Sequence, residues 1–246
     1  MTNVSQKTEN SATPHTPLLL DNDALARSEI AANACMNRQR NLLGANSYEK
    51  DLGFSPVDFL KKVLQSQTQV AWLDLCCGSG RALLQAASIF DSDKPKNIIQ
   101  LVGLDLIPMF DSIPRTSGHV RLFSASVEQW ETDEKFDLIT CVHGLHYVGD
   151  KLGTLERASG WMKENGRLIA HVDYRNLKIA GRKQPAGQIG KDLRKAGFKY
   201  LPSRHLLTRD GKLSNRLLPY RYLGADDKAG PNFTGQSAVD SYYERM

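Results

Sequence analysis

Short apolar segments alternate with amphipathic ones through the middle of the chain. The apolar segments suit buried strands, whereas the segments between them repeat apolar residues at the spacing of a helix. Strands that alternate with helical or irregular crossovers favour a parallel sheet covered on both faces. The pattern predicts strands at residues 70–76, 98–105, 119–125, 136–142 and 167–173, with helices at 81–90 and 151–163.

The ends of these elements carry start and stop signals. Asp150 can cap the helix at 151–163, and Asn165-Gly166 supplies a left-handed stop before the following strand. The crossover at residues 106–118 contains two prolines, which leave room for only a short helix.

The N-terminal region predicts two helices that precede the first strand. Residues 18–43 place apolar residues at a loose helical spacing, with Asp21 or Asp23 as the cap. A second helix begins at Ser55, because Pro56 suits its first turn. We therefore expect a disordered leader at residues 1–20, a helical cap or lid at 21–68, the main domain at 69–224 and a tail at 225–246.

The C-terminal region predicts a helix followed by two strands. The helix at 187–196 ends at Gly197, and strand-like runs at 198–208 and 212–224 are joined by a hairpin turn at Arg209-Asp210-Gly211. The tail after residue 224 looks mostly irregular. The expected fold is α/β, a doubly wound and mostly parallel seven-stranded sheet with a C-terminal antiparallel hairpin and an N-terminal helical cap.

Composition narrows the class of protein. No window approaches the roughly 18 consecutive apolar residues of a membrane span. The four cysteines form no C-x-x-C pair and have no histidine at zinc spacing, so we expect neither disulfides nor a metal site, and a reducing cytoplasm fits best. The net charge of +5 is modest and its basic residues are scattered, which favours an ordinary solvated basic face over a polyanion site.

The segment WLDLCCGSGR, residues 72–81, joins the first strand to a glycine turn that opens a helix. Such a turn lets a ligand lie against bare backbone at the carboxyl end of a sheet. The third glycine of a dinucleotide motif is absent, because Leu83 stands at its position. Asp105, at the end of the second strand, suits ribose hydroxyls. Asp74 would repel a pyrophosphate but would favour a positively charged ligand.

Four ordered motifs resemble those of class I S-adenosylmethionine (SAM)-dependent methyltransferases. WLDLCCGSGR and LVGLDL resemble the first and second motifs of that family, and FDLITCVHGLHYVGD and WMKENGRLIAHVD resemble its fourth-strand and fifth-strand motifs. The resemblance covers residues 70–174 in order. It implies a SAM-binding domain at 69–224, SAM as cofactor and S-adenosylhomocysteine (SAH) as product.

The resemblance also implies residue roles within the cofactor site. Asp74, Gly78 and Gly80 would line the methionine and ribose part, and Asp105 would bind the ribose hydroxyls. Leu106 would pack on the adenine. Two positions after the third strand and one carbonyl at the end of the fourth complete this set: Ser126, Val127 and Val142. Apart from the resemblance, Arg40 and Tyr48, in the linker region between the two N-terminal helices, could reach the methionine carboxylate of the cofactor or close over the site, because a guanidinium suits a carboxylate.

Cys76 stands where this family commonly has its first glycine. If that position required a positive φ, a cysteine would be strained there. We expect Cys76 to end the strand in an ordinary conformation, and Cys77 to pack as a small apolar residue.

Methyl transfer from a sulfonium is an in-line displacement, so positioning and exclusion of water are the main tasks. A histidine near the methyl group could serve as general base. His146 is the first candidate and His143 the second, although either could simply hydrogen-bond to backbone or cofactor. Residues at the rim of the predicted site could orient the substrate: Tyr147, Asp173 and Tyr174.

The acceptor class follows from what stands after the fourth strand. Nucleic-acid amino-methylating enzymes carry an N/D-P-P-Y run there, whereas this chain has VHGLHY, so nucleic acid is disfavoured. LHYV with a helical cap resembles enzymes that methylate nitrogen or oxygen, and less often carbon, of quinone-like or secondary-metabolite small molecules. The alternatives are an RNA or protein methyltransferase and a catalytically silent SAM-binding protein. Monomer and homodimer are both left open.

Overall fold

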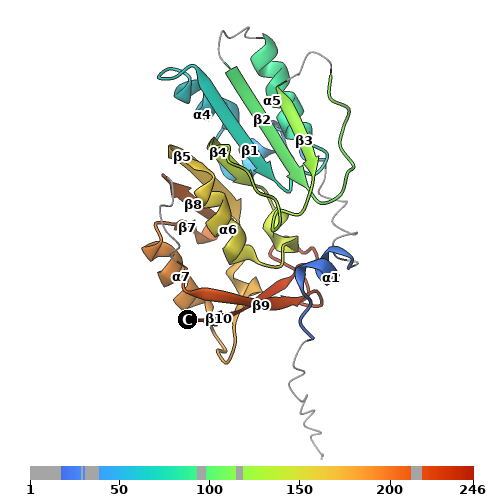
Figure 1. Cartoon of the computed structure of the whole chain (residues 1–246), viewed down its shortest axis with the longest axis vertical. Coiled ribbons are helices and arrows are strands. Elements are labelled where there is room, and N and C mark those ends of the chain that lie inside the picture. The colour runs from blue at the N-terminus through green and yellow to red at the C-terminus, as the bar shows by residue number, and fades with distance from the viewer. Residues whose placement is uncertain (1–17, 29, 31–38, 93–97, 115–118, 212–217) are drawn as a thin grey trace, which may run out of the picture.

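A seven-stranded sheet forms the centre of the computed structural model (Figure 1). The structure describes residues 18–28, 30, 39–92, 98–114, 119–211 and 218–246. The strand order is β3-β2-β1-β4-β5-β8-β7. The strands are β1 (Gln69–Leu75), β2 (Ile98–Asp105), β3 (Val120–Ser124), β4 (Phe136–Cys141), β5 (Met162–His171), β7 (Lys199–Leu201) and β8 (Leu206–Asp210).

Only one strand of this sheet runs against the others. β1 to β5 pair in parallel, β8 is antiparallel to β5, and β7 is antiparallel to β8. β7 therefore has the same direction as β1 to β5. The predicted fold class, a mostly parallel seven-stranded sheet that ends in an antiparallel hairpin, is confirmed.

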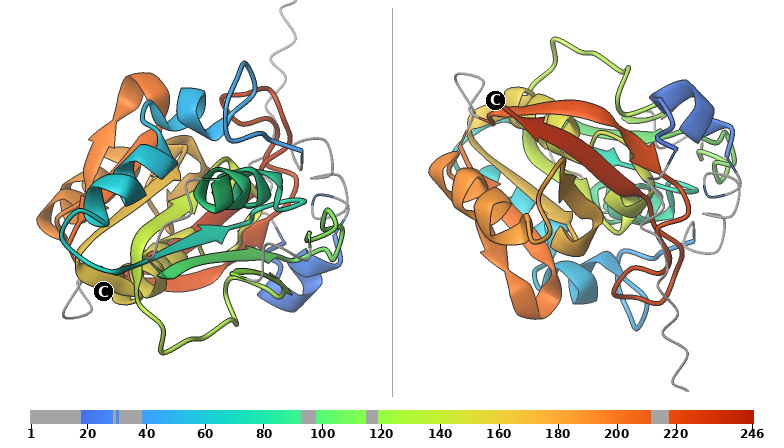
Figure 2. Two further views of the ribbon diagram at one scale, coloured as in Figure 1. Left: turned by 90° about the horizontal axis from the view of Figure 1, so that it is seen from above. Right: turned by 90° about the horizontal axis from the view of Figure 1, so that it is seen from below.

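Helices cover both faces of the sheet, as Figure 1 and Figure 2 show. Val70 and Trp72 of β1 pack with the helices of one face, whereas Leu73 and Leu75 pack with those of the other. This alternation follows from the period of two in a strand. None of the helices in the described ranges is long and apolar enough to cross a membrane. The helices are α4 (Pro56–Val63) and α5 (Arg81–Ser92) on the first face, and α6 (Lys151–Gly160) and α7 (Ala186–Lys195) on the second.

The predicted helix starts are confirmed, but one predicted stop is wrong. The Ser55 side chain caps α4 by accepting from the backbone N–H of Asp58, and Asp150 caps α6 in the same way from Gly153. α6 ends at Gly160 rather than at Lys163, and β5 begins at Met162. Asn165-Gly166 therefore lies inside β5, where the backbone passes close to the carbonyl of Phe136.

The prediction of one helix over residues 18–43 is wrong where the structure describes that region. Asp21 caps a helix of five residues, α1 (Asn22–Ala26), as predicted. Asn41, however, bridges to Ser47 in an extended conformation. The expected linker contains a further helix, α3 (Tyr48–Leu52), which Ser47 caps at its start. Residues 1–17 of the expected leader, and the middle of the expected helix at 31–38, lie outside the described residues.

The hairpin lies earlier in the chain than predicted. β7 and β8 are joined through a 3-10 turn at Pro202–Arg204, so both strands come from the first predicted run. The next strand instead enters a second sheet of order β6-β10-β9, which lies across the carboxyl ends of the main sheet in Figure 1. Residues 227–239 of the expected tail lie outside both strands, as a mostly irregular tail predicts, but the tail also contains the strand β10, which was not predicted. The domain boundaries stay predictions. The second sheet contains β6 (Leu177–Ile179), β9 (Tyr220–Asp226) and β10 (Asp240–Arg245).

Candidate active site

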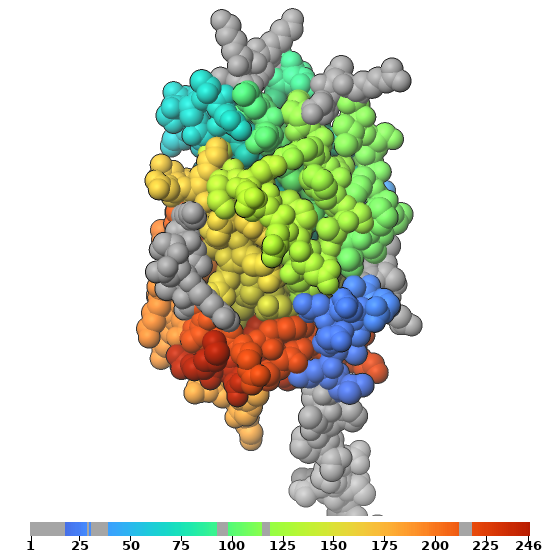
Figure 3. Space-filling view, in the orientation of Figure 1, coloured from blue at the N-terminus to red at the C-terminus, as the bar shows by residue number. Residues whose placement is uncertain are grey.

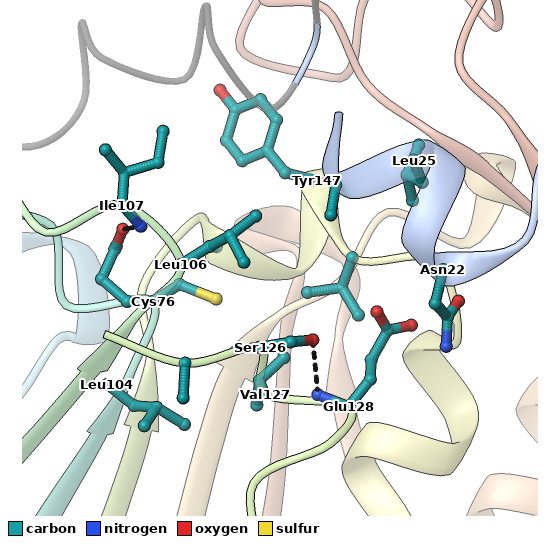
Figure 4. A pocket seen from close by; sticks show the side chains of 15 residues that line it. Asn22, Leu25, Cys76, Leu104, Leu106, Ile107, Ser126, Val127, Glu128 and Tyr147 are labelled. Atoms are coloured by element: carbon teal, nitrogen blue, oxygen red, sulfur yellow. Dashed lines mark hydrogen bonds between the residues drawn. The ribbon is translucent and has the colours of Figure 1, made fainter. Parts of the chain in front are cut away.

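A cavity that opens to solvent lies at the carboxyl ends of β1 to β4, beside α1 (Figure 4). Leu25 of α1 reaches it from the N-terminal side, and Leu104 and Asp105 reach it from the end of β2. Figure 3 shows the blue residues of α1 against the green segment that follows β3 and the orange-red residues of β9. The N-terminal region therefore forms one wall of the cavity.

The glycine turn after β1 is tied to the acid that ends β2. Gly78 and Gly80 have positive φ values of 63° and 77°. The backbone N–H of Gly78 donates to Oδ2 of Asp105 at 2.8 Å, and Ile107 N–H donates to Oδ1 at 3.1 Å. A carboxylate oxygen can accept more than one hydrogen bond, so an acid at this position suits a ligand that carries hydroxyl groups. The turn and Asp105, predicted to share the site, are thus in contact.

Cys76 is the exception to the predicted backbone at this turn. Its φ is 57°, in the left-handed region, so the expectation of an ordinary strand end is wrong. Such a conformation costs a non-glycine residue about 1–2 kcal/mol. A glycine in the turn after the neighbouring β4 leaves the room: a Cβ on Gly144 would lie 2.2 Å from Cβ of Cys76 and 2.8 Å from its sulfur. The Cys76 side chain therefore occupies the space beside Gly144, at the wall of the cavity.

Asp74 is fully buried beneath the turn and is bound by two hydroxyls. Tyr48 donates to its Oδ2 at 2.6 Å, and Thr140 donates to its Oδ1 at 2.6 Å. Burial raises the pKa of Asp74 to about 7, against the lowering effect of these two hydrogen bonds. Tyr48 therefore contacts the predicted acid of the first motif, and its direct contact with a cofactor stays a prediction.

The positions assigned to adenine line the far end of the cavity (Figure 4). Leu106, Ser126 and Val127 face it, as expected from the resemblance. The sequence analysis missed Glu128, which also lines the cavity and accepts from the backbone N–H of Asp150 at 2.6 Å. Burial raises the pKa of Glu128. Glu128 stands two positions after Ser126, which the sequence analysis assigned to the cofactor.

Four imidazoles gather at the carboxyl ends of β4, β5 and the start of β8. We call His143, His146, His171 and His205 the histidine cluster. The rings of His143 and His171 stack at 4.1 Å with an interplanar angle of 10°, and His143 lies 5.9 Å from His146. His143 also has a positive φ of 60° and directly precedes Gly144, a residue of the cavity wall. The histidine cluster therefore adjoins the cavity.

Asp51 of α3 connects the histidine cluster to the N-terminal region. Its Oδ2 lies 3.7 Å from Nε2 of His143 and also forms an ion pair with Arg40. Burial alone would raise the pKa of Asp51, but the neighbouring His143 imidazole and the charge of Arg40 outweigh it and lower the pKa. Arg40, predicted to reach a cofactor carboxylate, binds this side-chain carboxylate in the structure. The sequence analysis missed Asp51.

Burial keeps two members of the histidine cluster neutral. It lowers the pKa of His146 to about 3 and that of His171 to about 2, and the charge on protonated His143 would add to both effects. Three buried imidazole nitrogens have no hydrogen-bond partner among the described residues: His143 Nδ1, His146 Nε2 and His171 Nδ1. They remain open to a ligand.

The predicted rim residues lie in three different places. Tyr147 lines the cavity, and its hydroxyl donates to Gln236 at 3.0 Å. Asp173 is buried and bound by Arg175. Tyr174 stacks on Tyr200 at 4.0 Å and faces α7. Val142, at the end of β4, is buried.

The C-terminal segment covers the histidine cluster. The backbone N–H of Val239 donates to the carbonyl of His146 at 2.9 Å. Buried Lys151 donates to the carbonyls of Val148 and Val239 at 2.8 and 2.7 Å, and to the hydroxyl of Ser241 at 2.9 Å. The sequence analysis missed this covering role, because the tail showed no regular pattern of apolar residues.

The chain matches a protein family and solved structures, whereas no curated protein matches it. Residues 37–209 match a family described as "Methyltransferase domain". Coclaurine N-methyltransferase is 21% identical with a TM-score of 0.37, over 56% of this chain and 41% of that one. A SAM-dependent methyltransferase from Clostridium acetobutylicum is 23% identical with a TM-score of 0.36, over 46% and 48%. The [4+2]-cyclase SpnF is 16% identical with a TM-score of 0.46, over 75% of each chain.

The family match covers the cavity wall from β1 onward, Asp51 and the whole histidine cluster. The chain covers only 43%, 41% and 48% of the lengths of the first three solved structures that it matches. The ordered motifs, the reversed β8 and the match over residues 37–209 agree with one another. This chain belongs to the class I, Rossmann-like family of SAM-dependent methyltransferase domains.

Proposed function

We propose that this protein transfers the methyl group of SAM to a nitrogen or oxygen, in preference to carbon, of a small-molecule acceptor and releases SAH. The observation that carries the proposal is the histidine cluster beside the cavity of a methyltransferase domain. The two regions meet at consecutive residues, since His143 belongs to the cluster and Gly144 to the cavity wall. A cofactor in the cavity and an acceptor at the cluster would therefore be neighbours.

The residues of the cavity suit an adenosyl cofactor. Asp105 would accept from the ribose hydroxyls, because it ends β2 beside the glycine turn and a carboxylate can accept several hydrogen bonds. Leu106 and Val127 would pack on the adenine, and Ser126 would bind its amino group together with Glu128. SAM supplies an electrophilic methyl group on a positively charged sulfur.

The methionine end of the cofactor would lie over the glycine turn. Gly78 and Gly80 present bare backbone there, and the carbonyl of Val142 would meet the ammonium group. Asp74 lies beneath the turn and would contribute a field that favours a cation once it is ionised. Arg40 and Tyr48 would act through Asp51 and Asp74, the two acids they bind.

His143 is the general base that the geometry supports best, ahead of His146. Its Nε2 lies near the Asp51 carboxylate, while its Nδ1 has no partner among the described residues. A carboxylate beside one nitrogen stabilises the imidazolium that forms when the other nitrogen takes a proton from the acceptor. Burial lowers the pKa of His146 to about 3, which suits a neutral hydrogen-bonding group.

The rim residues would then shape the acceptor side. Tyr147 joins the cavity to the C-terminal segment through Gln236, and Asp173 holds the turn after β5 through Arg175. Tyr174 would support that turn by packing against α7.

The proposal is tested by measuring SAH release with SAM and a panel of phenol and amine acceptors. We expect His143→Gln to lower kcat by about 10²–10⁴-fold without weakening SAM binding, because it removes the proton acceptor alone. Asp51→Asn should lower kcat and move the pH profile in the same experiment. His119→Gln, at a histidine outside the cluster, is the matched control. A protein that binds SAM but releases no SAH with any acceptor would refute this function.

A further inference from the structure

The aromatic ring of Phe233 lies inside the histidine cluster. It stacks on His205 at 4.0 Å with an interplanar angle of 5°, and its centroid is 5.2 Å from His146 and 5.8 Å from His143. His171 is 6.2 Å away. A flat ring needs about 3.5–4 Å of clearance on each face. Phe233 thus lies in ring contact with all four imidazoles, and we call the position that its ring occupies the recess.

Phe233 belongs to a loop, residues 227–239, that is held at its base and braced within itself. The base is fixed where Val239 N–H donates to His146 and where Lys151 binds the Val239 carbonyl. Within the loop, Asn232 N–H donates to the carbonyl of Gln236 at 2.7 Å, and Ala238 N–H donates to Gly230 at 3.0 Å. Outside the loop, the tip is also tied to the cavity wall, because the hydroxyl of Tyr147 donates to Gln236 at 3.0 Å.

An apolar ring is a poor match for the groups around it. Three buried imidazole nitrogens of the cluster lack a partner among the described residues, and a phenyl ring can neither donate to nor accept from them. Leaving a buried polar atom unsatisfied is unfavourable, whereas a ring that carries a hydroxyl or an N–H would satisfy it. Phe233 stacks on an imidazole of the cluster, but it forms no hydrogen bond with the three unpartnered imidazole nitrogens.

The recess also presents little charge to a ligand. Burial keeps His146 and His171 neutral. The two carboxylates at its edge, Asp51 and Asp173, are paired with Arg40 and Arg175. Placing an ion there would require desolvation without an obvious free counter-charge, so an uncharged ligand is favoured.

We propose that Phe233 holds the place of the acceptor, which is an uncharged, flat aromatic or heteroaromatic ring carrying a hydroxyl or N–H group. The proposal rests on the proposed function, because it places the acceptor beside His143. The acceptor displaces Phe233 from its stack on His205 and satisfies the open imidazole nitrogens. Phe233 thereby selects for rings that stack at least as well as its own.

Binding of 2-naphthol to the SAH-loaded protein tests this proposal by calorimetry. We expect wild type to bind 2-naphthol at least about threefold more tightly than its saturated analogue decahydro-2-naphthol, and more tightly than anionic 2-naphthalenesulfonate. Phe233→Ala should bind 2-naphthol about threefold to tenfold more tightly than wild type, since an aromatic pair contributes on that order to an equilibrium. Phe54→Ala, a half-buried phenylalanine of another cluster, is the matched control and should leave binding unchanged.

Several outcomes would overturn the assignment. Weaker binding of 2-naphthol to Phe233→Ala would show that Phe233 is a wall of the site. Wild type that binds the saturated analogue as tightly as 2-naphthol, or that prefers the sulfonate, would refute the predicted ligand class. SAH-loaded wild type that does not bind 2-naphthol up to the solubility of the probe would also refute the proposal. Thermal unfolding of each variant shows whether it folds, and Phe233→Leu provides a milder change of the same sign. SAH binding is measured first. Its absence would refute the cofactor site, whereas SAH binding without stacking selectivity would refute only the role of Phe233.

Discussion

The side chain of Cys76, after β1, occupies space that a side chain on Gly144, after β4, would need. A Cβ on Gly144 would lie 2.2 Å from Cβ of Cys76 and 3.1 Å from the sulfur of Cys141. The first contact is shorter than any that side chains tolerate. This pair explains how a cysteine can adopt a positive φ at the first position of the glycine turn.

We expect Gly144→Ala to lower the free energy of unfolding by about 1–3 kcal/mol, because it overpacks this contact. It should also weaken SAM binding, since both residues line the cavity. Cys76→Gly in the same chain should restore most of the loss by removing the Cβ and sulfur that clash. Urea unfolding of the two single variants and the double variant checks this coupling. Additive losses would show that the two residues do not share one space.

Local patterns could predict some site residues but not others. Gly78, Gly80 and Asp105 stand at fixed distances from strand ends, so their proximity follows from a parallel sheet. Asp51 and Phe233 reach the site from the N-terminal region and the C-terminal segment, and no periodicity in either segment specifies that contact. The conformation of Cys76 was also beyond sequence reasoning, because it depends on Gly144 in a different motif.

At the scale of elements, Lys151 fastens the C-terminal strand to the first turn of α6. Its ammonium group donates to two carbonyls and one hydroxyl within 2.9 Å, and its side chain is buried. Burial lowers the pKa of Lys151 to about 7, although the nearby charge of Asp240 opposes this shift. The buried cation is retained because three acceptors surround it.

Lys151→Met should lower the free energy of unfolding by about 1–3 kcal/mol, because it leaves those acceptors without a donor. Lys178→Met is the matched control. Lys178, in β6, is half-buried and pairs at 3.1 Å with Asp240 of the C-terminal strand β10. The loss of this pair should lower the free energy of unfolding by less than about 1 kcal/mol. Chemical denaturation compares the two variants. Equal losses would indicate that the buried hydrogen bonds of Lys151 are not what fastens the strand.

The elements that the sequence predicted well are those with long apolar runs. β2 covers Ile98–Asp105, the predicted range, because a central strand is buried on both faces. The hairpin was misplaced because β9 carries as strong a strand pattern as β8, and pattern alone cannot tell which sheet a strand enters. α3 was missed because five residues are too few to show a helical period.

At the scale of the whole molecule, the buried imidazoles make folding stability depend on pH. The pKa values of His146 and His171 are lowered to about 3 and about 2, mainly by burial, whereas an unfolded histidine titrates near 6.5. Below pH 6.5 the unfolded chain therefore binds protons that the folded chain excludes. Each histidine reduces stability as the pH falls, by about 1.4 kcal/mol per pH unit.

We expect His146→Asn to flatten the pH dependence of the free energy of unfolding between pH 6 and 4 by roughly 1 kcal/mol per pH unit relative to wild type. His119→Asn, outside the histidine cluster, should flatten it much less. Urea unfolding at several pH values measures both slopes. Parallel curves for wild type and His146→Asn would mean that His146 takes up a proton in the folded protein.

The central claim is that a SAM cofactor binds where the glycine turn meets Asp105. Calorimetric titration of the protein with SAM tests it most directly. We predict one site per chain, and a loss of about 2–4 kcal/mol of binding free energy in Asp105→Ala, because the ribose hydroxyls lose a charged acceptor. Asp210→Ala, at an exposed acid paired with Arg167, should bind as wild type does. No heat with saturating SAM, or unchanged affinity in Asp105→Ala, would contradict the account.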